Sequence, residues 1–332
     1  MIISKTPFRI SFFGGGTDYP AWSQEHGGAV LSATIDKYCY ISCRYLPPFF
    51  DHKYRIVYSN IESVKMINEI QHPSVRAVLE YLECNKGLEI HHDGDLPARS
   101  GLGSSSSFTV GLLHTLSALK GKYISKDELA RQAIHVEQNL IGEHVGSQDQ
   151  VAAAFGGLNK IQFFRDGDFS VEPVILGRDR KAELEDHLML FFTGLQRNAP
   201  DIAKSKIDNL HNRSDALHEM RQMVIQALSI LQDDSQDIAG FGELLEQSWQ
   251  LKRSLSDKVS NDLIDKLYET AKRAGAAGGK LLGAGGGGFL LLFVRPEQQD
   301  KVRQALNKLI YVPVNFDDSG TKIVLYQPNG LG

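Results

Sequence analysis

The sequence predicts an α+β protein built from two domains, and three observations support this. The chain has 332 residues, more than one domain usually contains. Strand-like apolar runs and amphipathic helical patterns both occur along the chain. A polar, loop-like stretch over residues 165–181 separates two such regions. We therefore expect a first domain over residues 1–175 and a second over residues 176–332.

The first predicted strand covers residues 8–13 and carries Arg9 within an apolar run. Because a buried arginine needs an anionic partner, Arg9 is expected to face a carboxylate or a phosphate. The strand leads into the loop Gly14, Gly15, Gly16, Thr17 and Asp18. Consecutive glycines allow close backbone approaches that a Cβ would prevent. Asp18 can accept hydrogen bonds from the vicinal hydroxyls of a sugar, although a plain Asx turn explains its position equally well.

Strands and one helix follow in the first domain. We expect strands over residues 29–35, 37–45, 54–59 and 88–92, with Asp36 at a turn between the first two. A helical pattern covers residues 72–84.

A glycine- and serine-rich loop then precedes an apolar helix that ends near Gly121. The loop consists of Pro97, Ala98, Arg99, Ser100, Gly101, Leu102, Gly103, Ser104, Ser105, Ser106 and Ser107. Small residues at the start of a helix expose unpaired N–H groups, and the helix dipole adds partial positive charge there. This pattern favours a phosphate site. A flexible linker is the alternative, but the loop lies between a strand and a buried helix. It is not a Walker A loop, because no Gly-Lys-Ser/Thr ends it.

The next helix begins at a capping box formed by Ser125 and Glu128. Its buried side is predicted to continue to Leu140, and Glu137 lies near its end. A second short helix starts near Asp149, and a strand covers residues 158–164. From position alone, Glu137 belongs to a solvated helix face and Asp149 to a helix N-cap.

The second domain is expected to begin with a buried strand over residues 187–193, which precedes Arg197. Long helices follow over about 203–231, 241–255 and 260–274, and the domain ends with a helix over 298–309 and strands over 311–316 and 322–325. A second glycine run, residues 283–288, matches G-x-G-x-x-G but leads into a strand, which excludes a dinucleotide fingerprint. Gly285 and Gly286 are expected either to contact the substrate or to support the phosphate loop.

Composition excludes several classes of function. The net charge of −4 gives no electrostatic reason to bind nucleic acid or an anionic membrane. Three cysteines fit neither a zinc site nor a disulfide framework. The N-terminus shows no signal-peptide pattern, and no apolar run is long enough to span a bilayer, so a cytoplasmic protein is expected. The oligomeric state, monomer or homodimer, stays open.

Three motifs follow one another along the chain: the strand and loop with Arg9, Gly14–Gly16 and Asp18, the loop Pro97–Ser107, and the loop Leu282–Gly288. In this order they resemble the motifs of the GHMP kinase superfamily. The resemblance implies an N-terminal domain of the ribosomal protein S5 domain 2 type, a ferredoxin-like C-terminal domain, and ATP and Mg²⁺ as cofactors. It implies that the loop Pro97–Ser106 wraps the ATP phosphates, with Ser105 (or Ser104) reaching magnesium. The spacing from Glu137 to Asp149 is similar to that in galactokinases. The resemblance implies that Glu137 is the magnesium carboxylate and that Asp149 is the catalytic base. Arg9 then lies beside the base, and Asp18 binds the sugar.

One departure from this resemblance bears on the substrate. Galactokinases carry Gly-Glu-His where this chain has Gly14, Gly15 and Gly16, so a carboxylate that meets a free hydroxymethyl group is missing. The Phe-Gly-Gly-Gly-Thr-Asp-Tyr-Pro form is similar to that of the heptose 7-phosphate kinases, which implies phosphorylation of the anomeric hydroxyl of a sugar phosphate. The substrate residues would be Gly14, Gly15, Gly16, Thr17, Asp18, Arg197, Gly285 and Gly286. Arg99, Arg197 and Lys160 are candidates for the substrate phosphate. A kinase for an unphosphorylated sugar and a non-catalytic sugar or nucleotide sensor are the alternatives.

Overall fold

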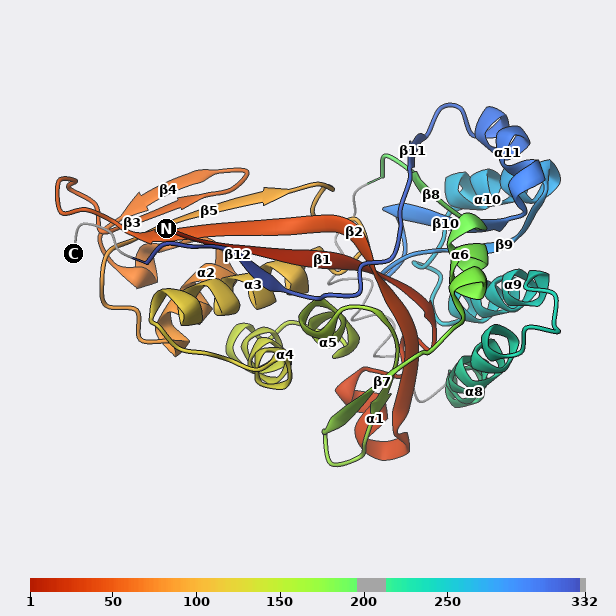
Figure 1. Cartoon of the computed structure of the whole chain (residues 1–332), viewed down its shortest axis with the longest axis horizontal. Coiled ribbons are helices and arrows are strands. Elements are labelled where there is room, and N and C mark those ends of the chain that lie inside the picture. Colours follow the sequence, from red (N-terminus) through yellow and green to blue (C-terminus); the bar gives the residue numbers. More distant parts are fainter. Residues whose placement is uncertain (196–212, 329–332) are drawn as a thin grey trace.

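A computed structural model describes residues 1–195 and 213–328 of the chain. Two sheets lie side by side along the long axis of the molecule (Figure 1). The larger sheet has eight strands and the smaller has four, and helices pack against both. The predicted α+β class is therefore confirmed. Among the described helices, none is long and apolar enough to cross a membrane.

The larger sheet has the strand order β12-β1-β2-β5-β3-β4, with β6 beside β2 and β7 beside β6. All its pairs are antiparallel except β3 with β5. Its strands are β1 (Ile2–Phe13), β2 (Gly28–Tyr45), β3 (Tyr54–Val57), β4 (Ile61–Val64), β5 (Leu88–Gly94), β6 (Leu158–Phe163), β7 (Phe169–Pro173) and β12 (Lys322–Tyr326).

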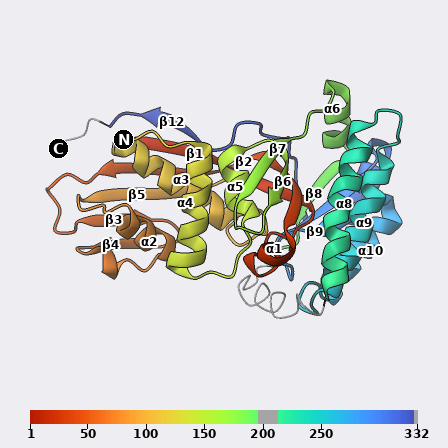
Figure 2. The ribbon, with the colours of Figure 1, turned by 90° about the horizontal axis from the view of Figure 1, so that it is seen from below.

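Helices cover one face of this sheet, as Figure 2 shows. They are α2 (Pro73–Tyr81), α3 (Ser104–Leu119), α4 (Lys126–His135) and α5 (Gln148–Phe155), while α1 (Pro20–His26) lies beyond the end of β1. The central helix α3 is almost wholly buried and packs on β1 and β2. This contact needs a glycine, because a Cβ at Gly111 would lie 2.8 Å from the Thr6 hydroxyl.

The smaller sheet has the antiparallel order β11-β8-β10-β9. Its strands are β8 (Leu188–Phe192), β9 (Ala276–Leu281), β10 (Phe289–Val294) and β11 (Ile310–Val312), and its helices are α6 (Arg178–Asp186), α8 (Ser214–Gln232), α9 (Ala239–Ser254), α10 (Asp262–Ala274) and α11 (Gln299–Ala305). The apolar core continues between the two sheets, since Phe12 and Phe13 of β1 pack edge-on against Phe241 of α9.

Three sequence predictions about elements are corrected. The predicted turn at Asp36 is absent, because residues 28–45 form the single long strand β2. The stretch 165–181, predicted as a loop, contains β7 and the start of α6. The serines of the phosphate loop were predicted to precede the helix, but Ser104 is the first residue of α3.

The last strand, β12, returns to the larger sheet and pairs with β1. A division of the chain at residue 175 therefore leaves one strand of the first sheet in the second segment. The edge strand β12 and its neighbour β1 therefore come from opposite ends of the sequence (Figure 1).

Candidate active site

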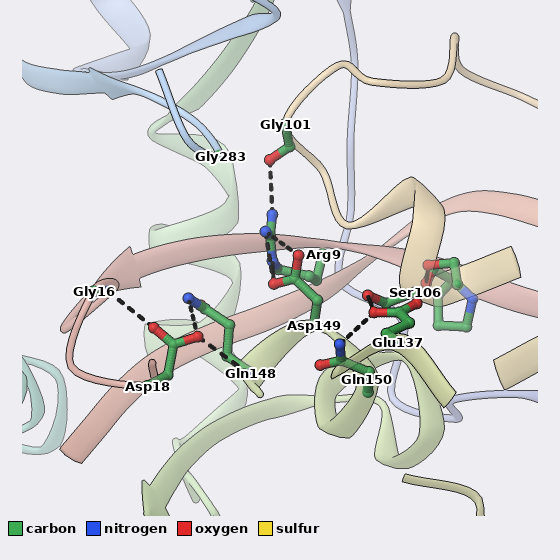
Figure 3. Close-up of polar contacts among 12 residues, drawn as sticks. Arg9, Gly16, Asp18, Gly101, Ser106, Glu137, Gln148, Asp149, Gln150 and Gly283 are labelled. Carbon is green, nitrogen blue, oxygen red and sulfur yellow. Dashed lines mark hydrogen bonds and ion pairs between the residues drawn. The ribbon is translucent and has the colours of Figure 1, made fainter. Parts of the chain in front are cut away.

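An ion pair between Arg9 and Asp149 lies at the centre of the site (Figure 3). Arg9 projects from β1 and Asp149 from the first turn of α5. The Arg9 Nε and Nη2 atoms donate to the two carboxylate oxygens at 2.7 and 2.8 Å. The arginine is buried, while a quarter of the Asp149 side chain stays exposed. The predicted anionic partner of Arg9 is thus a carboxylate that remains accessible to a reactant.

A buried carboxylate, Asp18, lies on one side of this pair (Figure 3). It accepts hydrogen bonds from the backbone N–H of Gly16 at 2.9 Å and from the Gln148 side-chain amide at 3.0 Å. Burial is the main cause that raises its pKa; the backbone N–H groups of Gly16 and Gln148 oppose the rise, and nearby Asp149 adds to it. Asp18 is therefore more than an Asx turn, because it joins the glycine loop after β1 to the start of α5.

One glycine of this loop, Gly15, does not adopt a backbone conformation that requires glycine. Gly14 and Gly16 have positive φ angles of 80° and 113°, which favour glycine. Gly15 has no such angle, and a Cβ there would meet only the Ser11 hydroxyl at 3.3 Å and the Gln148 amide nitrogen at 3.5 Å. The Ser11 Oγ and Gln148 Oε1 atoms are buried and lack a partner among the described residues. Polar groups thus surround the position at which galactokinases carry a glutamate.

The serine-rich loop lies on the other side of the ion pair, and its carbonyl groups are bound by protein. Gly101 O accepts from Arg9 Nη1 at 2.8 Å, and Leu102 O accepts from the Arg9 backbone N–H at 3.1 Å. Ser100 O accepts from the Phe289 N–H at 3.1 Å. The N–H groups of the first helical turn, beginning at Ser104, have no carbonyl one turn earlier to pair with. The loop therefore offers donors, as a phosphate site requires.

Glu137 is fully buried beside this first turn. Its Oε2 accepts from the Ser106 hydroxyl at 2.9 Å and from the Gln150 side-chain amide. Burial raises the pKa of Glu137 to about 7, although the nearby polar side chains of Thr109, Ser106 and Gln150 oppose the rise. The Thr109 hydroxyl itself donates to Ser105 O at 3.2 Å. Its Oε1 has no hydrogen-bond partner among the described residues.

A π-helical turn explains why Leu140 faces outward. The helix α4 continues as a π-helix over Val136–Ile141, which changes the phase of the side chains. Glu137 is buried, whereas Leu140, predicted on the buried side, is 46% exposed. The predicted burial of Leu140 is wrong for this reason. Glu137 is buried because it lies four residues after the buried Ala133, on the same helix face, so the alternative of a solvated position does not hold.

An unpartnered carboxylate oxygen beside a hydroxyl fits a magnesium ion, which binds few protein ligands and keeps oxygens of phosphate and water. The hydroxyl that contacts Glu137 is that of Ser106, whereas the predicted Ser105 side chain is exposed. Because the serines are helical, successive side chains point about 100° apart. A role of Ser105 at the magnesium ion stays a prediction.

The second glycine run packs on neighbouring backbone. A Cβ at Gly283 would overlap the Cα of Gly101, and a Cβ at Gly101 would lie 2.6 Å from Leu282 O. Gly286 donates its N–H to Val259 O at 2.8 Å, and a Cβ at Gly285 would lie 2.7 Å from the same residue. The structure thus gives this run a supporting role; substrate contact by Gly285 or Gly286 stays a prediction.

The three cations predicted for the substrate phosphate lie in different surroundings. Arg197 lies outside the described residues. Lys160 forms an ion pair with Glu172 at 2.9 Å. Arg99 lies in the serine-rich loop with a φ of 58° and is exposed.

Sequence reasoning missed several polar residues of the site. Gln148 and Gln150 flank Asp149. Ser106 was predicted as part of the phosphate loop, but its contact with Glu137 was not predicted. Lys252 of α9 donates to the carbonyls of Leu281 and Gly283 at 2.6 and 2.7 Å and so fastens the second glycine run. The two glutamines had one available signal, since amides adjacent to a candidate base can reach neighbouring carboxylates.

Comparisons with known proteins identify related families. A model of the GHMP kinases N terminal domain matches residues 68–157, and a model of the GHMP kinases C terminal domain matches residues 224–312.

Individual relatives carry the names of sugar kinases. A D-glycero-alpha-D-manno-heptose 7-phosphate kinase of Campylobacter jejuni is 31% identical over 320 residues, which cover 92% of this chain and 93% of the relative. A bifunctional fucokinase/GDP-fucose pyrophosphorylase of Arabidopsis thaliana is 26% identical, and the alignment covers 92% of this chain and 31% of that protein. A crystal structure of a D-glycero-D-manno-heptose 1-phosphate kinase from Bacteroides thetaiotaomicron has a TM-score of 0.79 and 26% identity, covering 97% of this chain and 98% of that one.

Proposed function

The chain belongs to the GHMP kinase family, and from this premise we propose that it transfers the γ-phosphate of ATP to the anomeric hydroxyl of D-glycero-D-manno-heptose 7-phosphate, giving the 1,7-bisphosphate. One observation carries the proposal. The Arg9–Asp149 pair lies between Asp18 on one side and the Glu137–Ser106 pair on the other. An accessible base thus stands between a sugar-binding carboxylate and a phosphate-binding helix start.

Each residue has a role in the transfer. Asp149 accepts the proton of the attacking hydroxyl, and the bidentate contact with Arg9 fixes the direction of its carboxylate. The N–H groups at the start of α3 bind the ATP phosphates. Glu137 and Ser106 would hold Mg²⁺, which neutralises charge on the β- and γ-phosphates when bound. No lysine of the Walker A type is needed in this arrangement.

The choice of a heptose phosphate rests on the glycine loop and on the relatives. The absence of a side chain at Gly15, beside Ser11 and Gln148, supports a longer, anionic substrate end there. Two relatives are named as kinases of heptose phosphates, although the two names place the substrate phosphate at different carbons. A fucokinase is also among the relatives, which keeps an unphosphorylated sugar as the competing acceptor.

A substrate panel tests the proposal. Purified protein with Mg·ATP is offered heptose 7-phosphate, heptose 1-phosphate, free heptose, fucose and galactose, and ADP release is measured. We expect the highest kcat/KM with heptose 7-phosphate, and faster turnover of a free sugar would contradict the substrate. ATP binding without turnover of any acceptor would instead favour the sensor alternative.

Substitution of the proposed base tests the chemistry separately. We expect Asp149→Asn to lower kcat by at least about 10²-fold, because general-base catalysis contributes on this scale. Binding of a non-hydrolysable ATP analogue should stay near that of the wild type. An unchanged kcat would remove Asp149 from the role of base, whatever the acceptor is.

A further inference from the structure

Gln150 is fully buried and lies one residue after Asp149 on α5. Its side-chain Nε2 donates to Glu137 Oε2, the same oxygen that accepts from the Ser106 hydroxyl at 2.9 Å (Figure 3). The other oxygen of the carboxylate, Oε1, accepts no hydrogen bond from the described residues. Both donors therefore lie on one side of Glu137.

Two donors on one oxygen fix the rotation of a carboxylate about its terminal bond. We propose that Gln150 is a positioning residue for the metal, which holds Glu137 Oε2 so that Oε1 is presented to the cation. This inference rests on the proposed role of Glu137 as the magnesium carboxylate. Outer partners of a metal ligand act in this way in other metal sites, where their loss weakens metal binding 10–100-fold.

The other end of the Gln150 amide argues against a purely structural role. Its Oε1 is buried and has no partner among the described residues. A buried polar atom without a partner is unfavourable, so an apolar side chain of the same size would serve folding better. With Glu137 ionised, as a metal ligand must be, the contact sets the amide orientation, because only Nε2 can donate to a carboxylate.

The neighbouring amide provides a comparison on the same helical turn. Gln148 donates through Nε2 to Asp18, so the two glutamines beside the base each reach a different carboxylate. If each amide acts on its own carboxylate, loss of Gln150 should affect the metal and loss of Gln148 should affect the sugar.

The test measures metal binding directly. The variant Gln150→Met keeps the volume and removes the donor. Mn²⁺ is titrated by electron paramagnetic resonance into the complex of the full chain with a non-hydrolysable ATP analogue. We expect Mn²⁺ to bind about 10-fold or more weakly than in the wild type. The Mg²⁺ concentration that gives half-maximal activity should rise equally, while the KM of the sugar phosphate stays within about twofold.

Three matched variants complete the design. Gln132→Met on α4 also removes a half-buried glutamine that donates to a glutamate, at 3.0 Å to Glu128, which is not a residue of the site. It should leave Mn²⁺ binding unchanged. Gln148→Met should raise the KM of the sugar phosphate and spare Mn²⁺ binding. Should Gln150→Met not fold, Gln150→Asn keeps the amide, shortens its reach by one methylene, and is expected to weaken Mn²⁺ binding likewise.

The outcomes separate this inference from the proposed function. Wild-type Mn²⁺ binding in a folded Gln150 variant overturns the positioning role, and so does an equal loss in Gln148→Met, which would indicate general loosening of α5. Glu137→Gln is measured in parallel. If Glu137→Gln also binds Mn²⁺ normally, the metal role of Glu137 itself fails.

Discussion

At the scale of single residues, the site depends on three carboxylates in three different environments. Asp149 is paired with a guanidinium and partly exposed, whereas Asp18 and Glu137 are buried and hydrogen-bonded. Burial disfavours the charged form of both buried groups and raises the pKa of each. The residues thus divide into one accessible carboxylate, which is the proposed base, and two buried acceptors, although all three are acidic side chains of nearly the same chemistry.

The raised pKa of Glu137 predicts a pH dependence of stability in the metal-free protein. Its pKa lies at about 7 in the folded chain, above the ordinary value of 4.5. The folded protein therefore binds this proton more tightly than the unfolded chain does. The resulting stabilisation is complete below about pH 4.5 and is lost as the pH rises through about 7, and it amounts to about 3 kcal/mol at most.

The variant Glu137→Gln stays neutral and should lack this dependence. We expect its melting temperature to fall less than that of the wild type between pH 5 and pH 8. Both proteins are measured in buffer that contains a chelator, which keeps them free of metal. Differential scanning calorimetry over this range checks the prediction. If the difference in melting temperature between the two proteins stayed the same at every pH, Glu137 would not titrate between pH 5 and pH 8.

The sequence led to the acidic residues and to Arg9, but not to their partners. Arg9, Asp18, Glu137 and Asp149 stand at motif positions, so the resemblance to a family selected them. The partners Ser106 and Gln150 depend on helical phase, and one residue decides which serine faces Glu137. That phase was not readable, because the run of four serines carries no apolar period that marks where α3 begins.

At the scale of elements, the sequence predicts the helices more accurately than it predicts where one strand ends and the next begins. The strand β2 passes through Asp36 because it changes partners along its length, pairing with β6 near Gly28 and with β5 near Tyr45. Asp36 is held within it by hydrogen bonds from Lys37 and Asn315. From the sequence alone, a charged residue between two apolar runs indicates a turn. The hydrogen bond that keeps Asp36 in the strand comes from Asn315, almost 280 residues away, and the local sequence gives no sign of it.

The contact between the two glycine runs predicts a sensitive position. Gly283 has a φ of 71°, and a Cβ there would overlap Gly101 Cα. Gly283→Ala should push the serine-rich loop from its place, since Gly101 O also binds Arg9. We expect the KM for ATP to rise about 10-fold and the melting temperature to fall, with at least about 1 kcal/mol of backbone strain.

Gly177→Ala is the matched control for this substitution. Gly177 has no positive φ, and a Cβ there would meet no atom within 4 Å. Its KM for ATP should equal that of the wild type, and its melting temperature should fall only slightly, because Gly177 is the N-cap of α6. An unchanged KM for ATP in Gly283→Ala would show that the second run does not support the phosphate loop.

At the scale of the whole molecule, the end of the chain supports the elements that form the site. Comparisons confirm the two-domain GHMP kinase architecture, yet β12 lies beyond both matched segments and pairs with β1. The Thr321 hydroxyl contacts that of Thr6 on β1 at 2.8 Å, and the Thr321 N–H donates to Ala153 O of α5 at 3.0 Å. The C-terminal segment therefore touches both the strand of Arg9 and the helix of Asp149.

Removal of this segment should disturb the site although every site residue remains. A chain that ends after Asp318 loses the β1–β12 ladder, the Thr321 contacts and the close packing of Gly320 on α5. Several buried hydrogen bonds are lost at about 1 kcal/mol each. We expect the melting temperature to fall by about 10 °C or more and kcat to fall with it, because Arg9 and Asp149 lie on the two destabilised elements.

As a control, Tyr326→Ser in β12 changes a side chain that is 56% exposed and should leave both quantities nearly unchanged. Calorimetry and steady-state kinetics on the two proteins decide the matter: wild-type melting and turnover in the shortened chain would mean that the larger sheet is complete without its last strand.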